Sequence, residues 1–97
     1  MEIKTSALAG TLESSDVLVS VGPNPEKGIK FELSSPVKKQ YGRQIKKVVM
    51  DTLSFLQVTD AMVKLVDKGA LDCVIKARLE AAVFRAAKAN FNWEEAR

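Results

Sequence analysis

IKFELSSPV, residues 29–37, is the stretch in which the pattern of the chain changes from that of a strand to that of a helix. From Ile29 to Leu33 apolar and charged residues alternate, which predicts a strand with one face on a core. Ser35 and Pro36 follow, as an N-cap residue and a proline in the first helical position, where its missing N–H costs nothing. We therefore expect a strand followed at once by a helix.

The residues before this stretch predict two further strands. Small and β-branched residues from Ile3 to Leu12 favour a first strand. Val17 to Val21 alternates with an apolar face and predicts a second. The loop from Gly22 to Gly28 holds two prolines between glycines, so we expect the strands at 17–21 and 29–33 to form an antiparallel hairpin.

The residues after Pro36 predict a helix to about Gln57, a fourth strand at Ala61–Val66 and a second helix that starts after Lys68-Gly69 and ends near Asn90. The buried stripe expected for the first helix is Val37, Tyr41, Ile45, Val48, Val49, Thr52, Leu53 and Leu56. That expected for the second helix is Leu71, Ile75, Leu79, Ala82 and Ala86. Asp72 in its first turn complements the helix dipole.

The order of these elements, βββαβα, predicts an α+β fold. A largely antiparallel four-stranded sheet with two helices packed on one face buries both helical stripes in a single layer contact. The chain has 97 residues, 46% of them hydrophobic and 28% charged, as in a globular protein. A chain of this length buries roughly 60 to 70% of its unfolded surface in one core, so we expect residues 1–97 to be a single domain.

Cysteine and histidine usage restricts the chemistry. Cys73 is the one cysteine and histidine is absent, so neither an intrachain disulfide nor a typical zinc site is expected. An enzyme that acts alone is disfavoured, because general acid–base chemistry would fall to carboxylates or lysine. The sequence shows no apolar stretch of signal-peptide length and no window of the roughly 20 apolar residues that span a membrane, so a cytoplasmic location is expected.

Positive charge is concentrated in the second part of the chain. Residues 1–35 hold three basic and five acidic side chains, and residues 36–97 hold twelve and seven. Five basic residues form what we call the basic cluster: Lys38, Lys39, Arg43, Lys46 and Lys47. It is either a solvated helix face or a surface for an acidic partner subunit, a phosphate-bearing group or nucleic acid. Nucleic acid is the weakest of these readings, because no recognisable binding motif is present and the net charge of +3 is small for that role.

Five other positions also have two readings. Arg78 and Arg85 lie beside the second apolar stripe, with their stems on the core or their guanidinium groups on a partner or phosphate. Cys73 lies near a helix start but has no histidine partner, which favours an ordinary reduced thiol. Phe91 and Trp93 either cover the domain or anchor an interface.

A polar joint, Gly10 to Asp16, connects the first two predicted strands. Serine and aspartate favour turns because they hydrogen-bond to nearby backbone, which is the structural reading of Glu13-Ser14-Ser15-Asp16. The functional reading is that a loop between strands exposes a hydroxyl to a modifying enzyme. Such a serine needs no local base, because the modifying enzyme can supply the activation.

The joint and three other stretches together resemble the acyl carrier (gamma) subunit of citrate lyase. The resemblance includes Met1–Thr5, Gly10–Asp16, Asp67–Cys73 and Ala77–Glu80, and extends to the tail with Trp93-Glu94. It implies that the first serine of the joint, Ser14, carries phosphoribosyl dephospho-coenzyme A through a phosphodiester. Differences from the family lie mostly in the loop at 22–28, in the basic run after Pro36 and in the last residues, which leaves the attachment position intact.

The resemblance also implies a role and a set of partners. A carrier of this family presents acetyl and citryl thioesters to an alpha subunit, an acyl transferase, and a beta subunit, an acyl lyase, which convert citrate to oxaloacetate and acetate. A holo-carrier synthase transferase attaches the group. The carrier subunit has no catalytic residues of its own, and the tether keeps the thioester at an effective concentration on the order of mM.

Two alternatives remain open at this point. The related acyl carrier of malonate decarboxylase uses the same kind of group, and the tail and the run from Asp67 to Asp72 favour citrate lyase over it. A basic α+β binding module for an acidic partner is the alternative from another functional class.

Overall fold

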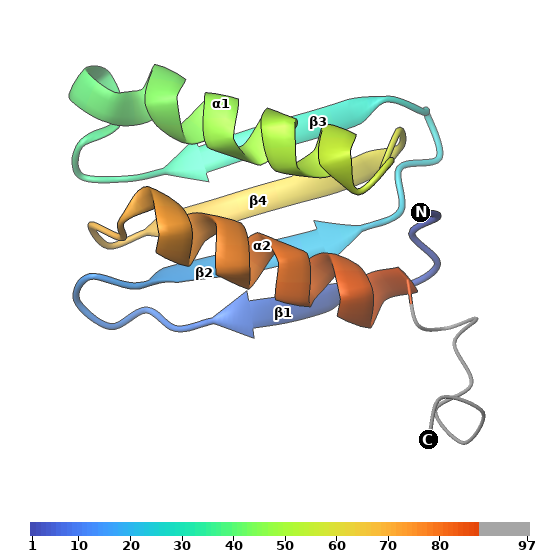
Figure 1. The fold of residues 1–97 in the computed structure, drawn as a ribbon, viewed down its shortest axis with the longest axis horizontal. Helices are drawn as coiled ribbons and strands as arrows, with labels where there is room; N and C mark the ends of the chain where they lie inside the picture. Colours follow the sequence, from blue (N-terminus) through green and yellow to red (C-terminus); the bar gives the residue numbers. More distant parts are fainter. Residues whose placement is uncertain (88–97) are drawn as a thin grey trace.

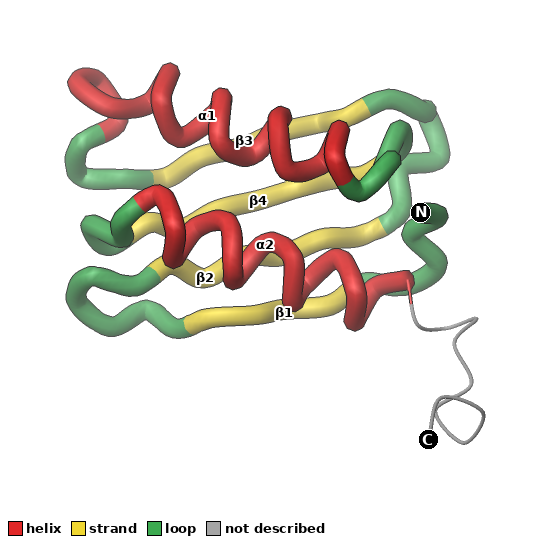
Figure 2. The backbone as a smooth tube through the Cα atoms, viewed as in Figure 1, coloured by secondary structure: helices red, strands yellow, loops and turns green. Residues whose placement is uncertain are grey.

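The chain folds into three strands, a helix, a fourth strand and a second helix (Figure 1). The computed structural model describes residues 1–87. Its elements are β1 (Ala7–Gly10), β2 (Val17–Gly22), β3 (Ile29–Ser34), α1 (Lys38–Phe55), β4 (Ala61–Asp67) and α2 (Asp72–Ala87). Both helices lie on the same face of the sheet (Figure 2), which confirms the predicted α+β architecture.

The strand order β1-β2-β4-β3 differs from the predicted hairpin. β4 lies between β2 and β3, antiparallel to β2 and parallel to β3, so the expected pairing of residues 17–21 with 29–33 is wrong. β4 takes the central place because Ala61, Val63 and Leu65 are all buried. The loop 23–28 has to cross only two strand spacings, roughly 10 Å, which six residues span easily. Two of the three pairings remain antiparallel, as predicted.

The first strand is shorter than predicted at both ends. The backbone amides of Lys4 and Thr5 donate to the carbonyl of Ala86 at 3.1 Å each, so this segment closes the end of α2 and does not extend the sheet. Met1 donates its ammonium group to the carbonyl of Gln57 at 2.7 Å, just beyond α1. The N-terminal residues therefore connect the ends of both helices.

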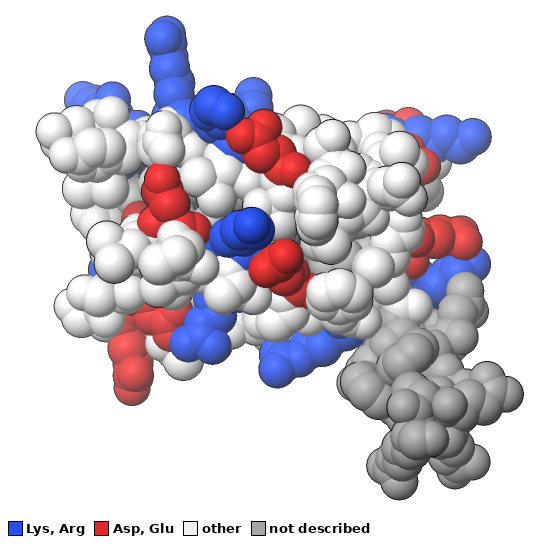
Figure 3. Space-filling view, viewed as in Figure 1, with Lys and Arg blue, Asp and Glu red and all other residues white. Residues whose placement is uncertain are grey.

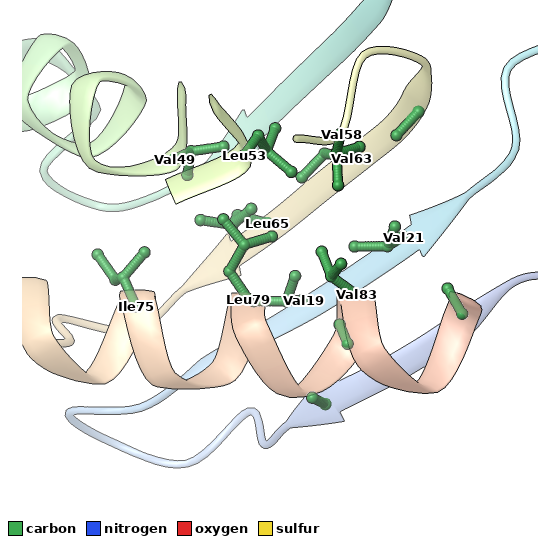
Figure 4. Close-up of a cluster of buried hydrophobic side chains, with 14 of the residues drawn as sticks. Val19, Val21, Val49, Leu53, Val58, Val63, Leu65, Ile75, Leu79 and Val83 are labelled. Carbon is green, nitrogen blue, oxygen red and sulfur yellow. The ribbon is translucent and has the colours of Figure 1, made fainter. Parts of the chain in front are cut away.

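The core lies between the helices and the sheet (Figure 4). Val19 of β2 and Leu65 of β4 are register partners, and both are fully buried. Leu53 comes from α1, and Ile75 and Leu79 come from α2. Full burial of such a side chain contributes roughly 1.5 to 3 kcal/mol relative to leaving it exposed. The predicted stripes thus hold the two helices to the sheet through the middle of each helix.

The predicted stripes are wrong where the helices begin. Tyr41 is 49% exposed and Leu71 is 71% exposed; Leu71 precedes the first turn of α2. Both border a groove of about 710 Å³ that opens between the starts of the two helices. The apolar residues keep their helical spacing at these positions, but no other part of the described chain packs over them.

The start of α1 also differs from the prediction. Ser35 was the expected N-cap, but its hydroxyl donates to the carboxylate of Asp67 at 2.8 Å, and Val37 occupies the cap position. The predicted end of α2 near Asn90 and the residues Phe91 and Trp93 lie outside the described part. Among residues 1–87, neither helix has the length and apolarity needed to cross a lipid bilayer.

Candidate functional site

Three loops meet at one end of the molecule: β1–β2, β3–α1 and β4–α2 (Figure 1). Ser14 lies in the first of them and is exposed, as is Ser15. The sequence predicted an exposed polar joint between two strands, and the structure has one. The site is the β1–β2 loop together with the residues that hold it.

Ser14 occupies the second position of a tight turn. The amide of Asp16 donates to the carbonyl of Glu13 at 3.1 Å, which closes the turn. Ser15, the third residue, has a φ of 63°, the positive value that a type II turn requires at that position. A residue other than glycine pays roughly 1 to 2 kcal/mol for this conformation. The turn therefore stores strain beside Ser14, in a segment that is otherwise well bonded.

The loop is joined to the neighbouring β4–α2 loop through backbone hydrogen bonds. The amide of Ser15 donates to the carbonyl of Lys68 at 2.8 Å, and the amide of Lys68 donates to the carbonyl of Asp16 at 2.9 Å. These bonds continue the antiparallel pairing of β2 with β4 beyond the register pair of Val17 and Asp67. The turn thus stands at the end of the two central strands.

Asp16 is the side chain that fastens the base of the loop. The guanidinium of Arg78 donates to both of its carboxylate oxygens, at 3.1 and 2.9 Å. The hydroxyl of Thr11 donates at 2.6 Å and the amide of Val17 at 2.8 Å. These hydrogen bonds lower the pKa of Asp16 from 3.8 to about 2, and the hydrogen bond from Arg78 has the largest effect. The carboxylate is therefore ionised throughout the physiological range and links the loop to α2.

Arg78 is the functional residue whose role the sequence did not reveal. It was expected to extend beside the core or to contact a partner or phosphate, and in the structure it binds Asp16, 62 positions away. Arg85 donates to the backbone carbonyl of Leu8 at 2.7 Å. The sequence showed a basic side chain beside the apolar stripe of α2 and an aspartate in the polar joint. It did not show that the two side chains lie next to each other in the fold.

The other side of the loop is closed by a hydrogen bond to Thr11 and by a close approach of the two strands at Gly10. Thr11 accepts a hydrogen bond from the amide of Glu13 at 3.2 Å. Gly10 has a φ of 97°, and a Cβ atom there would lie 1.8 Å from the carbonyl oxygen of Val17. Only glycine allows the two strands to approach so closely at this point.

The β4–α2 loop that supports the turn is itself fixed by a buried aspartate. The carboxylate of Asp67 accepts hydrogen bonds from the hydroxyl of Ser35 at 2.8 Å, the amide of Gly69 at 3.2 Å and the amide of Ala70 at 2.9 Å. A buried carboxylate requires such partners. Asp67 therefore joins the β3–α1 loop to the β4–α2 loop, on which the Ser14 turn rests.

The arrangement presents a hydroxyl without the groups that would make it a nucleophile on its own. Within residues 1–87, no side chain hydrogen-bonds to Ser14, and no group of three potential metal ligands occurs. Cys73 is exposed near the start of α2. An exposed hydroxyl on a firmly held turn is suited to be modified by another protein.

The sequence of this chain is similar to those of known carrier proteins. A family model described as "Malonate decarboxylase delta subunit" matches residues 4–86. The citrate lyase acyl carrier protein of Streptococcus mutans is 53% identical over 98% of this chain and 94% of its own length. That of Clostridium perfringens is 55% identical over 96% of this chain and 93% of its own. The chain belongs to the citrate lyase acyl carrier protein family. The predicted resemblance is thereby confirmed.

A chain in one solved structure has the same fold as this chain. A chain in the crystal structure of a Pseudomonas malonate decarboxylase hetero-tetramer in complex with malonate superimposes with a TM-score of 0.72, at 21% identity, over 87% of this chain and 86% of that one. This likeness shows the fold alone. Acyl carriers are non-catalytic subunits, so family membership places this chain among carriers and not among enzymes.

Proposed function

We propose that this chain carries the coenzyme-A-derived group of citrate lyase on the hydroxyl of Ser14. The observation that carries the proposal is the exposure of Ser14 at the tip of a turn whose base is clamped from two sides. Identity of more than half over nearly the whole chain to citrate lyase acyl carrier proteins supports the choice of complex. The group is phosphoribosyl dephospho-coenzyme A, joined through a phosphodiester.

The residues of the site fit such a group. A phosphodiester at the tip of the turn keeps its charge in water, which avoids the cost of burying an ion. Ser14 and Ser15 are both exposed, so the choice of Ser14 as the attachment residue rests on the family resemblance, which assigns the first serine of the joint. A transferase can approach Ser14 without the loss of any described side-chain hydrogen bond.

The chain's own residues hold the base of the attached group. Asp16 and Arg78 fix one end of the turn to α2, while Ser15 and Lys68 fix it to the β4–α2 loop. When attached, the group supplies a terminal thiol that bears acetyl or citryl as a thioester. Tethering raises the effective concentration of that thioester at a partner's active site to the order of mM.

The partners proposed for this carrier are those of the family. They are the alpha subunit, an acyl transferase; the beta subunit, an acyl lyase; and the holo-carrier synthase transferase that loads Ser14. We place the complex in the cytoplasm, where the lone thiol of Cys73 stays reduced. The carrier of malonate decarboxylase is the second candidate, favoured by the family model over residues 4–86.

Intact mass spectrometry of the protein from its native source tests the proposal. We expect the sequence mass plus one coenzyme-sized adduct, and fragmentation should locate the adduct on Ser14. An unmodified mass in cells growing on citrate would defeat the proposal. Loaded protein should also restore turnover to the catalytic subunits of citrate lyase and not to those of malonate decarboxylase; the reverse result would establish the second candidate.

A further inference from the structure

A groove of about 700 Å³ runs between α1 and the outer edge of β3. Its apolar side is formed by Phe31 and Leu33 of β3, both partly exposed. Its other side consists of four members of the basic cluster, Lys38, Lys39, Arg43 and Lys46. Lys and Arg side chains gather along the edge of the molecule that α1 forms (Figure 3). We call this feature the β3–α1 groove.

The charges in the β3–α1 groove are poorly balanced. Glu32 is the one acidic residue among the described residues that line it, against the four basic ones. Lys47, the fifth member of the basic cluster, instead donates to Asp51 at 2.8 Å, which raises the pKa of the lysine. The structure thus divides the predicted cluster into one paired lysine and four cations on a groove. A concave cationic surface attracts an acidic ligand.

β3 provides a row of free backbone groups along the same groove. It is the last strand in the order β1-β2-β4-β3, so within the described residues only β4 pairs with it. An edge strand of this kind offers N–H and C=O groups to an added strand. An extended peptide is therefore the shape of ligand that this edge accepts.

Gly42 supplies a second, independent observation. It lies inside α1 and lines the β3–α1 groove, although glycine is the least favourable residue in a helix interior apart from proline. A Cβ atom there would meet only the Cγ of Lys38, at 3.5 Å, which is an ordinary contact. The fold of this chain does not require glycine at 42. Its effect is to widen the groove.

We propose that the β3–α1 groove binds an extended, acidic segment of a partner protein. The segment adds a strand to the free edge of β3 and sets its carboxylates against Lys38, Lys39, Arg43 and Lys46. The groove lies at the opposite edge of the sheet from β1, whose loop carries Ser14. A partner held there leaves the Ser14 turn accessible. The proposal does not depend on which residue is modified.

A binding assay with a defined probe tests the proposal. The probe is a short fluorescein-labelled peptide of alternating glutamate and valine, measured by fluorescence anisotropy against the full chain at low and moderate salt. We expect binding that weakens as salt rises. The double variant Arg43→Gln, Lys46→Gln should bind on the order of tenfold more weakly. The matched control, Lys68→Gln with Lys76→Gln, removes the same charge at two exposed positions outside the groove and should change the affinity by no more than about twofold.

Two further comparisons test the shape of the site. Gly42→Leu keeps every charge and favours the helix, so it should abolish binding without lowering the melting temperature. A peptide N-methylated at alternate residues cannot pair with an edge strand, so it should bind much more weakly than the parent. Absence of binding by the parent peptide at low salt overturns the proposal. Equal binding of the N-methylated peptide, or of a peptide with glutamine in place of each glutamate, overturns it as well. Tighter, groove-dependent binding of a single-stranded RNA would overturn it in favour of nucleic acid.

Discussion

Gly10→Ala is expected to loosen the base of the Ser14 loop and to destabilise the whole domain. The new Cβ atom would lie 1.8 Å from the carbonyl oxygen of Val17 and 3.4 Å from the Cδ of Arg78, at a φ of 97°. The left-handed backbone costs an L residue roughly 1 to 2 kcal/mol, and relief of the overlap costs roughly 1 to 3 more. The free energy of unfolding should therefore fall by roughly 2 to 5 kcal/mol, measured by urea denaturation.

Gly28→Ala is the matched control for this prediction. Gly28 also has a positive φ, 84°, but a Cβ atom there would meet nothing within 4 Å. Only the backbone cost of roughly 1 to 2 kcal/mol should appear. The difference between the two variants measures the close approach of β1 to β2 at Gly10. Equal losses in the two variants would refute the tight closure of the loop base.

The remaining predictions concern the core, the clamp and the turn. Ile45→Ala and Leu79→Ala should each cost roughly 2 to 5 kcal/mol in urea melts, because both side chains are buried; losses below about 0.5 kcal/mol in both would refute the shared core. The pKa of Asp16, about 2, should return toward 3.8 in Arg78→Met, as read by carbon-13 NMR; an unchanged value would contradict the contact between Arg78 and Asp16. Because the folded-state pKa of Asp16 is lowered, its contribution to stability should be complete above pH 3.8 and be lost as the pH falls through about 2. Ser15→Gly should stabilise the domain by roughly 0.5 to 1 kcal/mol, since relief of the left-handed backbone exceeds the added entropy of the unfolded chain; a lower melting temperature would contradict the strain.

Local sequence patterns predicted the elements, because side-chain periodicity is set by strand and helix geometry. The alternation of Val17, Val19 and Val21 appears as three fully buried side chains. Local patterns did not predict the strand pairing. The residues of the loop at 22–28 indicate a turn, but they do not determine which strand pairs with β3. The central place of β4 follows from burial on the sheet, which only the assembled fold provides.

The sequence predicted that the Ser14 loop is exposed, but it did not predict the contacts that hold this loop in place. Turn-forming residue types placed Ser14 in an exposed joint, and the structure has it in a tight turn. The contact of Arg78 with Asp16 joins positions 62 apart, and no local pattern encodes such a pair. Tyr41 and Leu71 show a related limit, because a helical period does not reveal where the opposing layer ends.

Loading of serine variants tests the central claim most directly. Ser14→Ala and Ser15→Ala are incubated with the holo-carrier synthase transferase and the activated precursor, and intact masses are recorded. Both side chains are exposed, so neither change should alter stability by much more than about 0.5 kcal/mol, and a difference in loading reports on chemistry. Ser14→Ala should gain no adduct and Ser15→Ala should retain at least partial loading. Full loading of Ser14→Ala would show that the group is attached to another residue.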